Sequence, residues 1–146
     1  MAKKKIITNL QELRKPCQPI NDEKLIKNII KELEETLADY KEFGIGLSAN
    51  QIGYSYRVCI LRLDKTKVDL VNPKIVSKDI PFRYREEGCL SIPGLRVDTK
   101  RYNYIRVKAD NHESELLFTK LEAVAIQHEI SHLNGRTILD DKWRKR

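Results

Sequence analysis

The sequence predicts an α+β fold in which mainly antiparallel sheets surround a buried C-terminal helix. A long amphipathic helix pattern begins near residue 21, strand patterns occupy the region from Tyr56 to Phe118, and a strongly apolar helix pattern lies between Thr119 and Gly135. Strands that follow one another in a single run, rather than alternating with helices, are typical of this class. Since no repeat or linker divides the chain, residues 1–146 are expected to form one domain.

The composition is that of a soluble globular protein with a heavily charged surface. Hydrophobic residues make up 40% of the chain, charged residues 34%, and the net charge is +7. No apolar run reaches the roughly 18 residues of a membrane span, and no apolar segment of a secretory signal follows the basic start. An odd number of cysteines favours a reducing cytosol over disulfides. The positive charge fits a solvated basic surface or weak, non-specific contact with an anion such as RNA.

The N-terminal third is predicted to contain an arm and a helix. Pro16 and Pro19 would interrupt any helix in residues 6–20, so this segment is expected to be irregular and extended. A helix is predicted from Asn21 or Asp22, with an apolar face that packs in the core. Its apolar residues repeat every four positions, at Leu25, Ile29, Leu33 and Leu37.

Two strands are predicted in the middle of the chain. Residues 56–63 alternate apolar side chains on both faces, so Cys59 is interpreted as a small core residue. Residues 68–72 form the next strand, which Pro73 ends, and residues 75–76 are expected to continue it after a kink. Further on, residues 101–109 and 114–118 form a hairpin with the exposed His112 in its turn.

Three glycines lie within residues 44–53, which read Gly-Ile-Gly-Leu-Ser-Ala-Asn-Gln-Ile-Gly. Small residues at this density let the backbone approach a ligand closely. The spacing matches neither a dinucleotide-binding fingerprint nor a phosphate-binding loop. The segment is interpreted as a tight loop that ends in the amide of Gln51 and faces a ligand, or as a glycine-rich turn after a helix.

The C-terminal helix carries the pattern His-Glu-x-x-His. Thr119 and Glu122 are expected to form a capping box at its start, and Gly135 fits the left-handed position that ends a helix. His128 and His132 lie four residues apart and thus on one face, where both can reach one divalent metal. The alternative is a helix with two hydrogen-bonded core histidines.

A possible third ligand lies in residues 86–94, Glu-Glu-Gly-Cys-Leu-Ser-Ile-Pro-Gly. Gly88 frees the backbone beside Cys89, and Pro93-Gly94 is expected to form a turn. A cysteine in a polar loop can be without function. Beside a His/His helix, however, its thiolate would complete a three-ligand site with an open fourth position, which is the catalytic arrangement.

The three stretches together resemble the peptide deformylase family. Its Gly-hydrophobic-Gly-hydrophobic-Ala/Ser-Ala-x-Gln, Glu-Gly-Cys-Leu-Ser and Gln-His-Glu-x-x-His-x-x-Gly motifs stand here, in the family's order, at residues 44–51, 87–91 and 127–135. The resemblance runs from the N-terminal arm to the end of the metal helix. It implies a hydrolase that removes the formyl group from the N-terminal formylmethionine of new polypeptides, by means of a metal-bound water.

The resemblance also implies roles for individual residues. Glu129 would be the general base and would then give a proton to the departing amine, while Gln51 and the backbone N–H of Leu90 would stabilise the oxyanion. Ferrous iron is the metal that the family commonly uses, and zinc or nickel can occupy the site. The implied metal ligands are Cys89, His128 and His132. The implied substrate-binding residues are Gly44, Ile45, Gly46, Glu87, Gly88, Leu121, Val124 and Ala125.

The sequence departs from the family in two places. Ser131 stands where the family usually has Asp, and we hypothesise that a contact from this position to Arg101 is weaker here. Only eleven residues follow Gly135, so the C-terminal helix implicated in ribosome docking is missing, as in short bacteriophage-encoded forms. Residues 143–146, Trp-Arg-Lys-Arg, are a short basic substitute or a frayed tail.

The resemblance implies N-formylmethionyl peptides as substrates, weak transient association with the ribosome, and neither a membrane nor a specific nucleic acid as partner. A monomer in the cytoplasm of a bacterium or a phage-infected host is expected. One alternative is a zincin-like metallopeptidase, but no His follows His132, and Asp140 and Asp141 are poorly suited as third ligands. Others are a basic, metal-stabilised nucleic-acid-binding module, which lacks a fourth Cys or His ligand, and an inactive relative, against which Glu129 and Gln51 argue.

Overall fold

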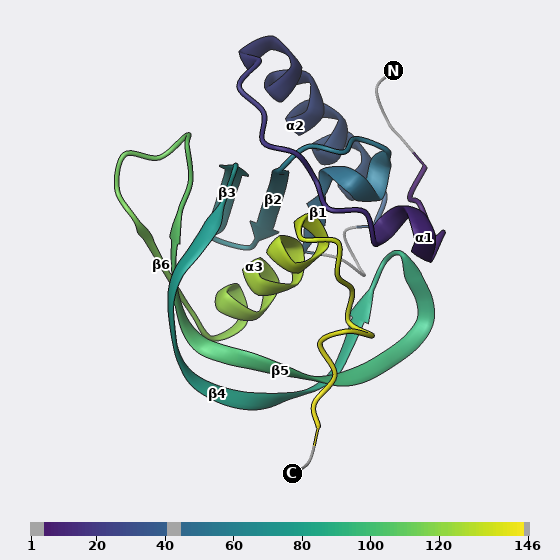
Figure 1. Cartoon of the computed structure of the whole chain (residues 1–146), viewed down its shortest axis with the longest axis vertical. Helices are drawn as coiled ribbons and strands as arrows, with labels where there is room; N and C mark the ends of the chain where they lie inside the picture. The colour runs from purple at the N-terminus through teal and green to yellow at the C-terminus, as the bar shows by residue number, and fades with distance from the viewer. Residues whose placement is uncertain (1–4, 41–44, 145–146) are drawn as a thin grey trace.

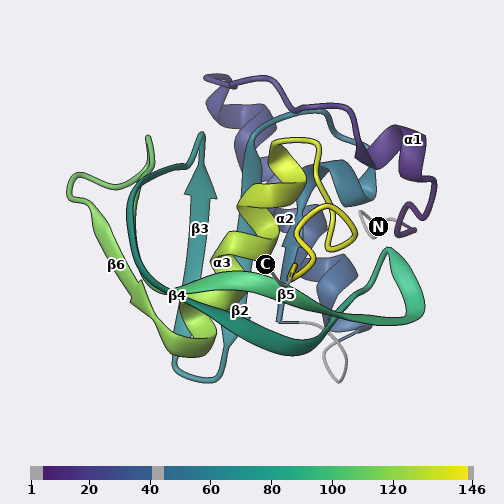
Figure 2. The same ribbon diagram turned by 60° about the horizontal axis from the view of Figure 1, so that its bottom comes forward.

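The computed structural model describes residues 5–40 and 45–144. Two antiparallel three-stranded sheets lie on either side of the C-terminal helix α3 (Lys120–Leu133) (Figures 1 and 2). The first sheet has the order β1 (Gly46–Ser48), β2 (Val58–Leu63), β3 (Thr66–Val71). The second has the order β4 (Lys74–Cys89), β5 (Ile92–Lys108), β6 (Leu116–Thr119). The predicted α+β fold is confirmed.

The predicted amphipathic helix is α2 (Glu23–Ala38), and it covers the outer face of the first sheet (Figure 1). The side chain of Asp22 caps its first turn by accepting a hydrogen bond from the N–H of Leu25, at 3.1 Å. Its apolar face packs on residues of β1 and β2 and shares one core with them. The arm before it is not wholly irregular, because Asn9 caps a short helix, α1 (Leu10–Leu13).

The predicted strand at residues 56–63 is β2, and both of its faces are buried, including Cys59. The next strand is β3, but the predicted continuation through Ile75 and Val76 is wrong. These two residues open β4, a long strand of the other sheet whose side chains are mostly exposed. This strand is defined by its pairing with β5, which extends from Cys89 opposite Ile92 to Lys74 opposite Lys108.

The predicted hairpin of residues 101–118 is formed by β5 and β6, with Ile105 opposite Phe118. The expected turn at Pro93-Gly94 is wrong, because both residues lie within β5. The chain reverses instead at Leu90-Ser91, directly after Cys89, so the cysteine ends a strand rather than lying in a loop.

Helix α3 begins after Thr119 and ends before Gly135, as predicted. The expected capping box is wrong: the Thr119 side chain makes no capping bond, and Glu122 instead accepts a hydrogen bond from the hydroxyl of Thr66. Gly135 has φ 76°, and a Cβ there would lie 2.7 Å from the carbonyl oxygen of Arg14. Only glycine therefore fits this close crossing of the arm.

The core between the two sheets contains one side of α3. Ala123, Ile126, Ile130 and Leu133 pack there with buried residues of both sheets. Within residues 5–40 and 45–144, no helix has the length and apolarity needed to cross a membrane. His112 was expected to be exposed but is half-buried, with its Nε2 atom 2.9 Å from the carbonyl oxygen of Asp69.

Candidate active site

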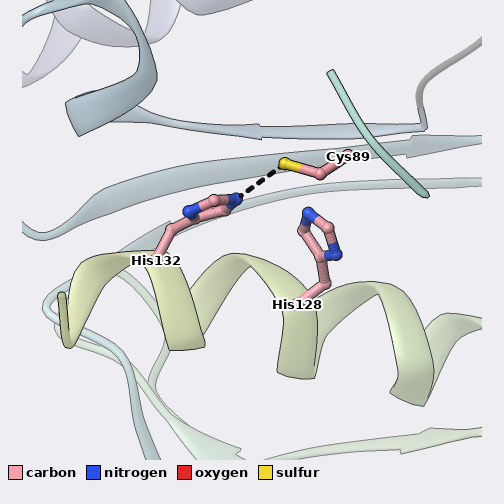
Figure 3. Close-up of side chains that lie close together, drawn as sticks. All are labelled: Cys89, His128 and His132. Atoms are coloured by element: carbon pink, nitrogen blue, oxygen red, sulfur yellow. Dashed lines mark hydrogen bonds between the residues drawn. The ribbon is translucent and has the colours of Figure 1, made fainter. Parts of the chain in front are cut away.

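The face of α3 opposite this core presents His128 and His132 one turn apart, with ring centroids 4.9 Å from each other. Cys89 reaches them from the end of β4, and its Sγ lies 3.3 Å from Nε2 of His132 (Figure 3). One ligand atom from each of the three residues lies within 4.8 Å of the other two. The helix and the second sheet thus bring the three predicted ligands together.

The donor set fits a divalent metal. One thiolate and two imidazoles are ligands that zinc, iron and nickel accept, and three protein ligands leave a coordination position open. In the part of the chain that the structure describes, the buried Oε1 atom of Glu129, beside this cluster, has no hydrogen-bond partner. Buried polar atoms without partners are costly unless another group occupies the site.

Glu87 orients the first histidine. Its Oε2 lies 2.6 Å from Nδ1 of His128, and the Arg101 guanidinium donates to both of its oxygens, at 2.8 and 2.5 Å. Burial would raise the pKa of Glu87, but the hydrogen bonds from His128 and Arg101 outweigh it and hold the pKa at about 2. Because this carboxylate is ionised, Nδ1 of His128 carries a proton, so Nε2 is the ring nitrogen through which His128 could bind a metal.

The two imidazoles have opposite electrostatic surroundings. Burial lowers the pKa of His128, but the charge of Glu129, with Cys89 and Glu87, raises it well above the usual value. For His132, burial is reinforced by the positive charges of His128 and Arg101, so the pKa is well below the usual value. His132 is therefore neutral and has a nitrogen available as a ligand.

Glu129 follows His128 but points to the first sheet. A Cβ on Gly46 would lie 2.8 Å from its Oε2 and 3.0 Å from the carbonyl oxygen of Ile60. The carboxylate therefore rests against the bare backbone of β1, in a space that any side chain at position 46 would fill. Glu129 is 3% exposed, and burial raises its pKa to about 7.

Gln51 faces Cys89 from the short helix η1 (Ala49–Ile52), which follows β1. Its Oε1 accepts hydrogen bonds from the N–H and the hydroxyl of Ser48, both at 3.0 Å. These bonds direct its amide nitrogen to Sγ of Cys89, at 3.9 Å, and to the hydroxyl of Ser91, at 3.0 Å. The amide N–H group is thus fixed beside the ligand cluster.

A pocket of ≈ 210 Å³ opens onto this cluster. Its lining includes Cys89, His128 and Glu129 together with Gln51 and Leu90. The predicted substrate-binding residues in its wall are Ile45, Gly46, Glu87, Gly88, Leu121, Val124 and Ala125. Gly44, also predicted, lies outside the described residues. Tyr84, Glu86 and Arg96 also line the pocket but were not predicted to do so. Tyr84 and Arg96 lie outside the three motifs, and Glu86 lies in the stretch around Cys89 but just before the Glu-Gly-Cys-Leu-Ser motif.

The hypothesis of a weakened contact between Ser131 and Arg101 needs correction. The Ser131 hydroxyl donates to Oδ2 of Asp141, at 2.6 Å, and Arg101 donates to the same oxygen, at 3.1 Å. A carboxylate from the C-terminal segment therefore connects the two residues. The segment is not frayed up to Trp143, because the backbone of Asp141 and Trp143 bonds to that of Lys100 and Asp98 in β5.

Comparisons with known proteins agree with this geometry. A family model described as polypeptide deformylase matches residues 4–146. A peptide deformylase of Aquifex aeolicus is 36% identical over 146 residues, covering 92% of this chain and 85% of that protein. The crystal structure of a peptide deformylase from Thermotoga maritima has a TM-score of 0.86 and 34% identity, covering 97% of this chain and 99% of the other. That of a peptide deformylase from Legionella pneumophila also has a TM-score of 0.86, with 33% identity and coverage of 97% and 86%.

Proposed function

The chain belongs to the polypeptide deformylase family and is a deformylase that acts on formylmethionyl peptides; on that premise we propose that Cys89, His128 and His132 hold the metal of its active site. The observation that carries this proposal is the cluster of one thiol and two imidazoles, of which Cys89 and His128 line the pocket. The family is metal-dependent, and we propose ferrous iron as the ion, with zinc or nickel as substitutes.

A bound divalent ion would supply a water molecule of lowered pKa and polarise the formyl carbonyl. The protein supplies the geometry. Glu87 holds the His128 ring through Nδ1, and η1 holds Gln51 beside Cys89. Ligands fixed in this way need little rearrangement when the ion binds.

Glu129 is the proposed general base. Its carboxylate is buried beside the ligand cluster, and its Oε1 has no partner in the described residues. It would accept a proton from the attacking water and deliver it to the nitrogen of methionine as the formyl group leaves. The bare backbone of Gly46 leaves room for the carboxylate on this side of the helix.

Gln51 and Leu90 are the proposed oxyanion donors. The amide nitrogen of Gln51 points to Cys89, and Leu90 directly follows that cysteine at the pocket wall. A side-chain N–H and a backbone N–H that both lie near a ligand can stabilise negative charge on the formyl oxygen. The Gln51 amide is already held in this orientation by its hydrogen bonds from Ser48.

The proposed site for the methionine side chain is the apolar wall of the pocket. Ile45, Leu121, Val124 and Ala125 form this wall next to the ligands. The backbone at Gly44, Gly46 and Gly88 is proposed to contact the backbone of the bound peptide. Glu87 would act indirectly, by holding the His128 ring through Nδ1. Apolar walls with a few fixed polar groups are typical of small-ligand sites.

We further propose that residues 1–146 act as one catalytic domain, because α3 and the pocket draw on both sheets. A monomer in the cytoplasm of a bacterium or an infected host is proposed, since formylated chains are made there. Contact with the ribosome is proposed to be weak and transient.

The test is hydrolysis of formyl-Met-Ala-Ser by protein purified without oxygen and loaded with iron. We expect release of formate and of a free amine, retention of activity with nickel, and loss of activity after chelation. Acetyl-Met-Ala-Ser is the matched control, since its larger acyl group should not be removed. Absence of product with iron, nickel and cobalt would contradict the proposal.

A further inference from the structure

The C-terminal segment after α3 crosses the second sheet (Figure 1) and pairs with β5 at one isolated bridge. Lys100 donates its backbone N–H to the carbonyl of Asp141 at 2.9 Å, and Trp143 donates to the carbonyl of Asp98 at 2.8 Å. Lys142 pairs with Thr99 as an isolated antiparallel bridge. These backbone bonds fix the position from which the Asp141 side chain reaches inward.

The Asp141 carboxylate accepts four hydrogen bonds. Its Oδ2 accepts from the Ser131 hydroxyl, at 2.6 Å, and from Nη1 of Arg101, at 3.1 Å. Its Oδ1 accepts from Nε and Nη2 of Arg136, at 3.0 and 2.8 Å. Charge-assisted bonds of this kind fix orientation strongly when the groups are shielded from water, and this side chain is 12% exposed.

These contacts continue to a proposed metal ligand. Arg101 is 4% exposed and has a carboxylate on each side: Asp141 at Nη1, and Glu87 at Nε and Nη2. Glu87 in turn holds Nδ1 of His128. A buried guanidinium that loses one of two partners keeps its charge but not its fixed orientation, so a change at Asp141 would reach His128 through two side chains.

We propose that Asp141 is a positioning residue for the metal centre: it links β5 to α3 and, through Arg101 and Glu87, sets the orientation of His128. Its second contact, Ser131, directly precedes the other histidine ligand on α3. Asp141 does not line the substrate pocket, so its effect falls on the metal and on turnover, and not on peptide binding. This inference rests on the metal site proposed above.

The test compares Asp141→Asn with the parent protein. Side chains that orient ligands typically contribute 10–100-fold to metal affinity or activity, and Asp141 acts on His128 through two further side chains, Arg101 and Glu87. We expect Co²⁺ affinity, measured by visible absorption against a competing chelator, to fall by about tenfold. We expect kcat to fall by a similar factor, and KM for formyl-Met-Ala-Ser to stay unchanged.

Asp140→Asn is the matched control. Asp140 belongs to the same segment and carries the same charge, but its carboxylate accepts from the N–H of Thr137 and faces Arg14 at 3.7 Å. An asparagine oxygen can still accept that bond. The control should keep the parental Co²⁺ affinity and kcat; a loss equal to that of Asp141→Asn would contradict the inference, because general disturbance of the segment would then explain both.

A relocation experiment separates positioning from mere stability. Since the Ser131 hydroxyl touches Oδ2 of Asp141, an aspartate at 131 would place a carboxylate where that oxygen lies. Ser131→Asp alone should lower Co²⁺ affinity, because two carboxylates would then face each other. Combined with Asp141→Ser, it should restore affinity and kcat above those of Asp141→Ser alone.

The outcomes distinguish the inference from the proposed function. A parent protein that binds no Co²⁺ through Cys89 and the two histidines would overturn both. A parent that binds Co²⁺ and deformylates, beside an Asp141→Asn variant with equal affinity and kcat, would overturn the inference alone. The inference alone would also be overturned if the folded double variant, Ser131→Asp with Asp141→Ser, had no higher affinity or kcat than Asp141→Ser. Thermal unfolding of each variant establishes that the variant is folded.

Discussion

The two sheets contribute to the active site in different ways. In the first sheet, four consecutive residues of β2, from Val58 to Leu61, are buried and apolar, and they pack on helices at both faces. In the second sheet, the buried residues nearest the ligands are polar or charged: Glu87, Thr99 and Arg101. Both sheets therefore hold α3 in place by apolar packing, but the second also supplies a ligand and the charged groups that orient another.

This contrast has a physical basis. Apolar burial is non-directional and fixes the position of a helix without fixing a hydrogen bond. Bonds between buried charges are directional but costly to leave incomplete. A site that must hold ligand atoms within a few tenths of an ångström needs both: α3 receives apolar packing from both sheets and contacts with buried charged groups from the second.

The largest effect should follow from removing the ligand of the second sheet. Cys89→Ala should lose the metal and all activity, because two ligands hold an ion poorly. Cys59→Ala, in the first sheet, should keep metal and kcat and lose only stability, because its thiol is buried in the core. Metal analysis and deformylation assays of both variants test this; equal metal content in the two would show that Cys89 is not a ligand.

A smaller loss should follow from a change on α3 itself. Glu129→Gln keeps the shape of the side chain and leaves the three ligands intact, so bound metal and KM should stay at parental values. Turnover should fall by roughly 10²–10⁴-fold, the usual contribution of a general base. The measurements are kcat, KM and metal content, and near-parental turnover in a metal-loaded variant would rule out this role.

Gly46→Ala should show that the first sheet can also affect catalysis, because Gly46 of β1 lies against the proposed general base. The added methyl would lie 2.8 Å from Oε2 of Glu129 and 3.0 Å from the carbonyl oxygen of Ile60, so the carboxylate must move. Displacement of a catalytic group by about 1 Å can cost up to about 10²-fold in rate. We expect lower kcat with metal content unchanged, and steady-state kinetics with metal analysis would show it. Parental kcat would mean that the carboxylate has freedom that the structure does not suggest.

The smallest effect on catalysis should come from a substitution in the apolar core of the first sheet. Leu61→Ala removes a fully buried side chain of β2 and should lower the free energy of unfolding by about 2–5 kcal/mol, with kcat per folded molecule unchanged. Leu117→Ala is the control, because Leu117 in β6 is 52% exposed and should cost no more than about 0.5 kcal/mol. Denaturant unfolding measures both. A large kcat loss in Leu61→Ala would show that packing and positioning are not separate.

The same contrast explains what the sequence could predict. The helix at α2 and the strand at β2 follow from local apolar patterns, because burial selects one face or both. Strand β4 was not predicted, since Val76 and Ile80 are exposed and burial therefore does not mark the first half of this strand as part of a sheet. Likewise His128 and His132 lie on one helix with a recognisable spacing, and Cys89 was found because its chemistry completes that pair.

The groups that orient the ligands were harder to find. Arg101 and Asp141 lie 40 residues apart, and neither belongs to a motif. Their contact exists only because the C-terminal segment folds back along β5. Short-range patterns contain no information about such a return, so the sequence indicated a departure at Ser131 but not the residue that contacts it.

X-ray absorption spectroscopy of the zinc-loaded protein can show directly whether Cys89, His128 and His132 hold one metal ion. The account predicts one sulfur ligand at about 2.3 Å and two imidazole nitrogens at about 2.0–2.1 Å. The sulfur contribution should disappear in any zinc that Cys89→Ala retains. A parent spectrum without sulfur, or with two sulfur ligands per zinc, would contradict the account.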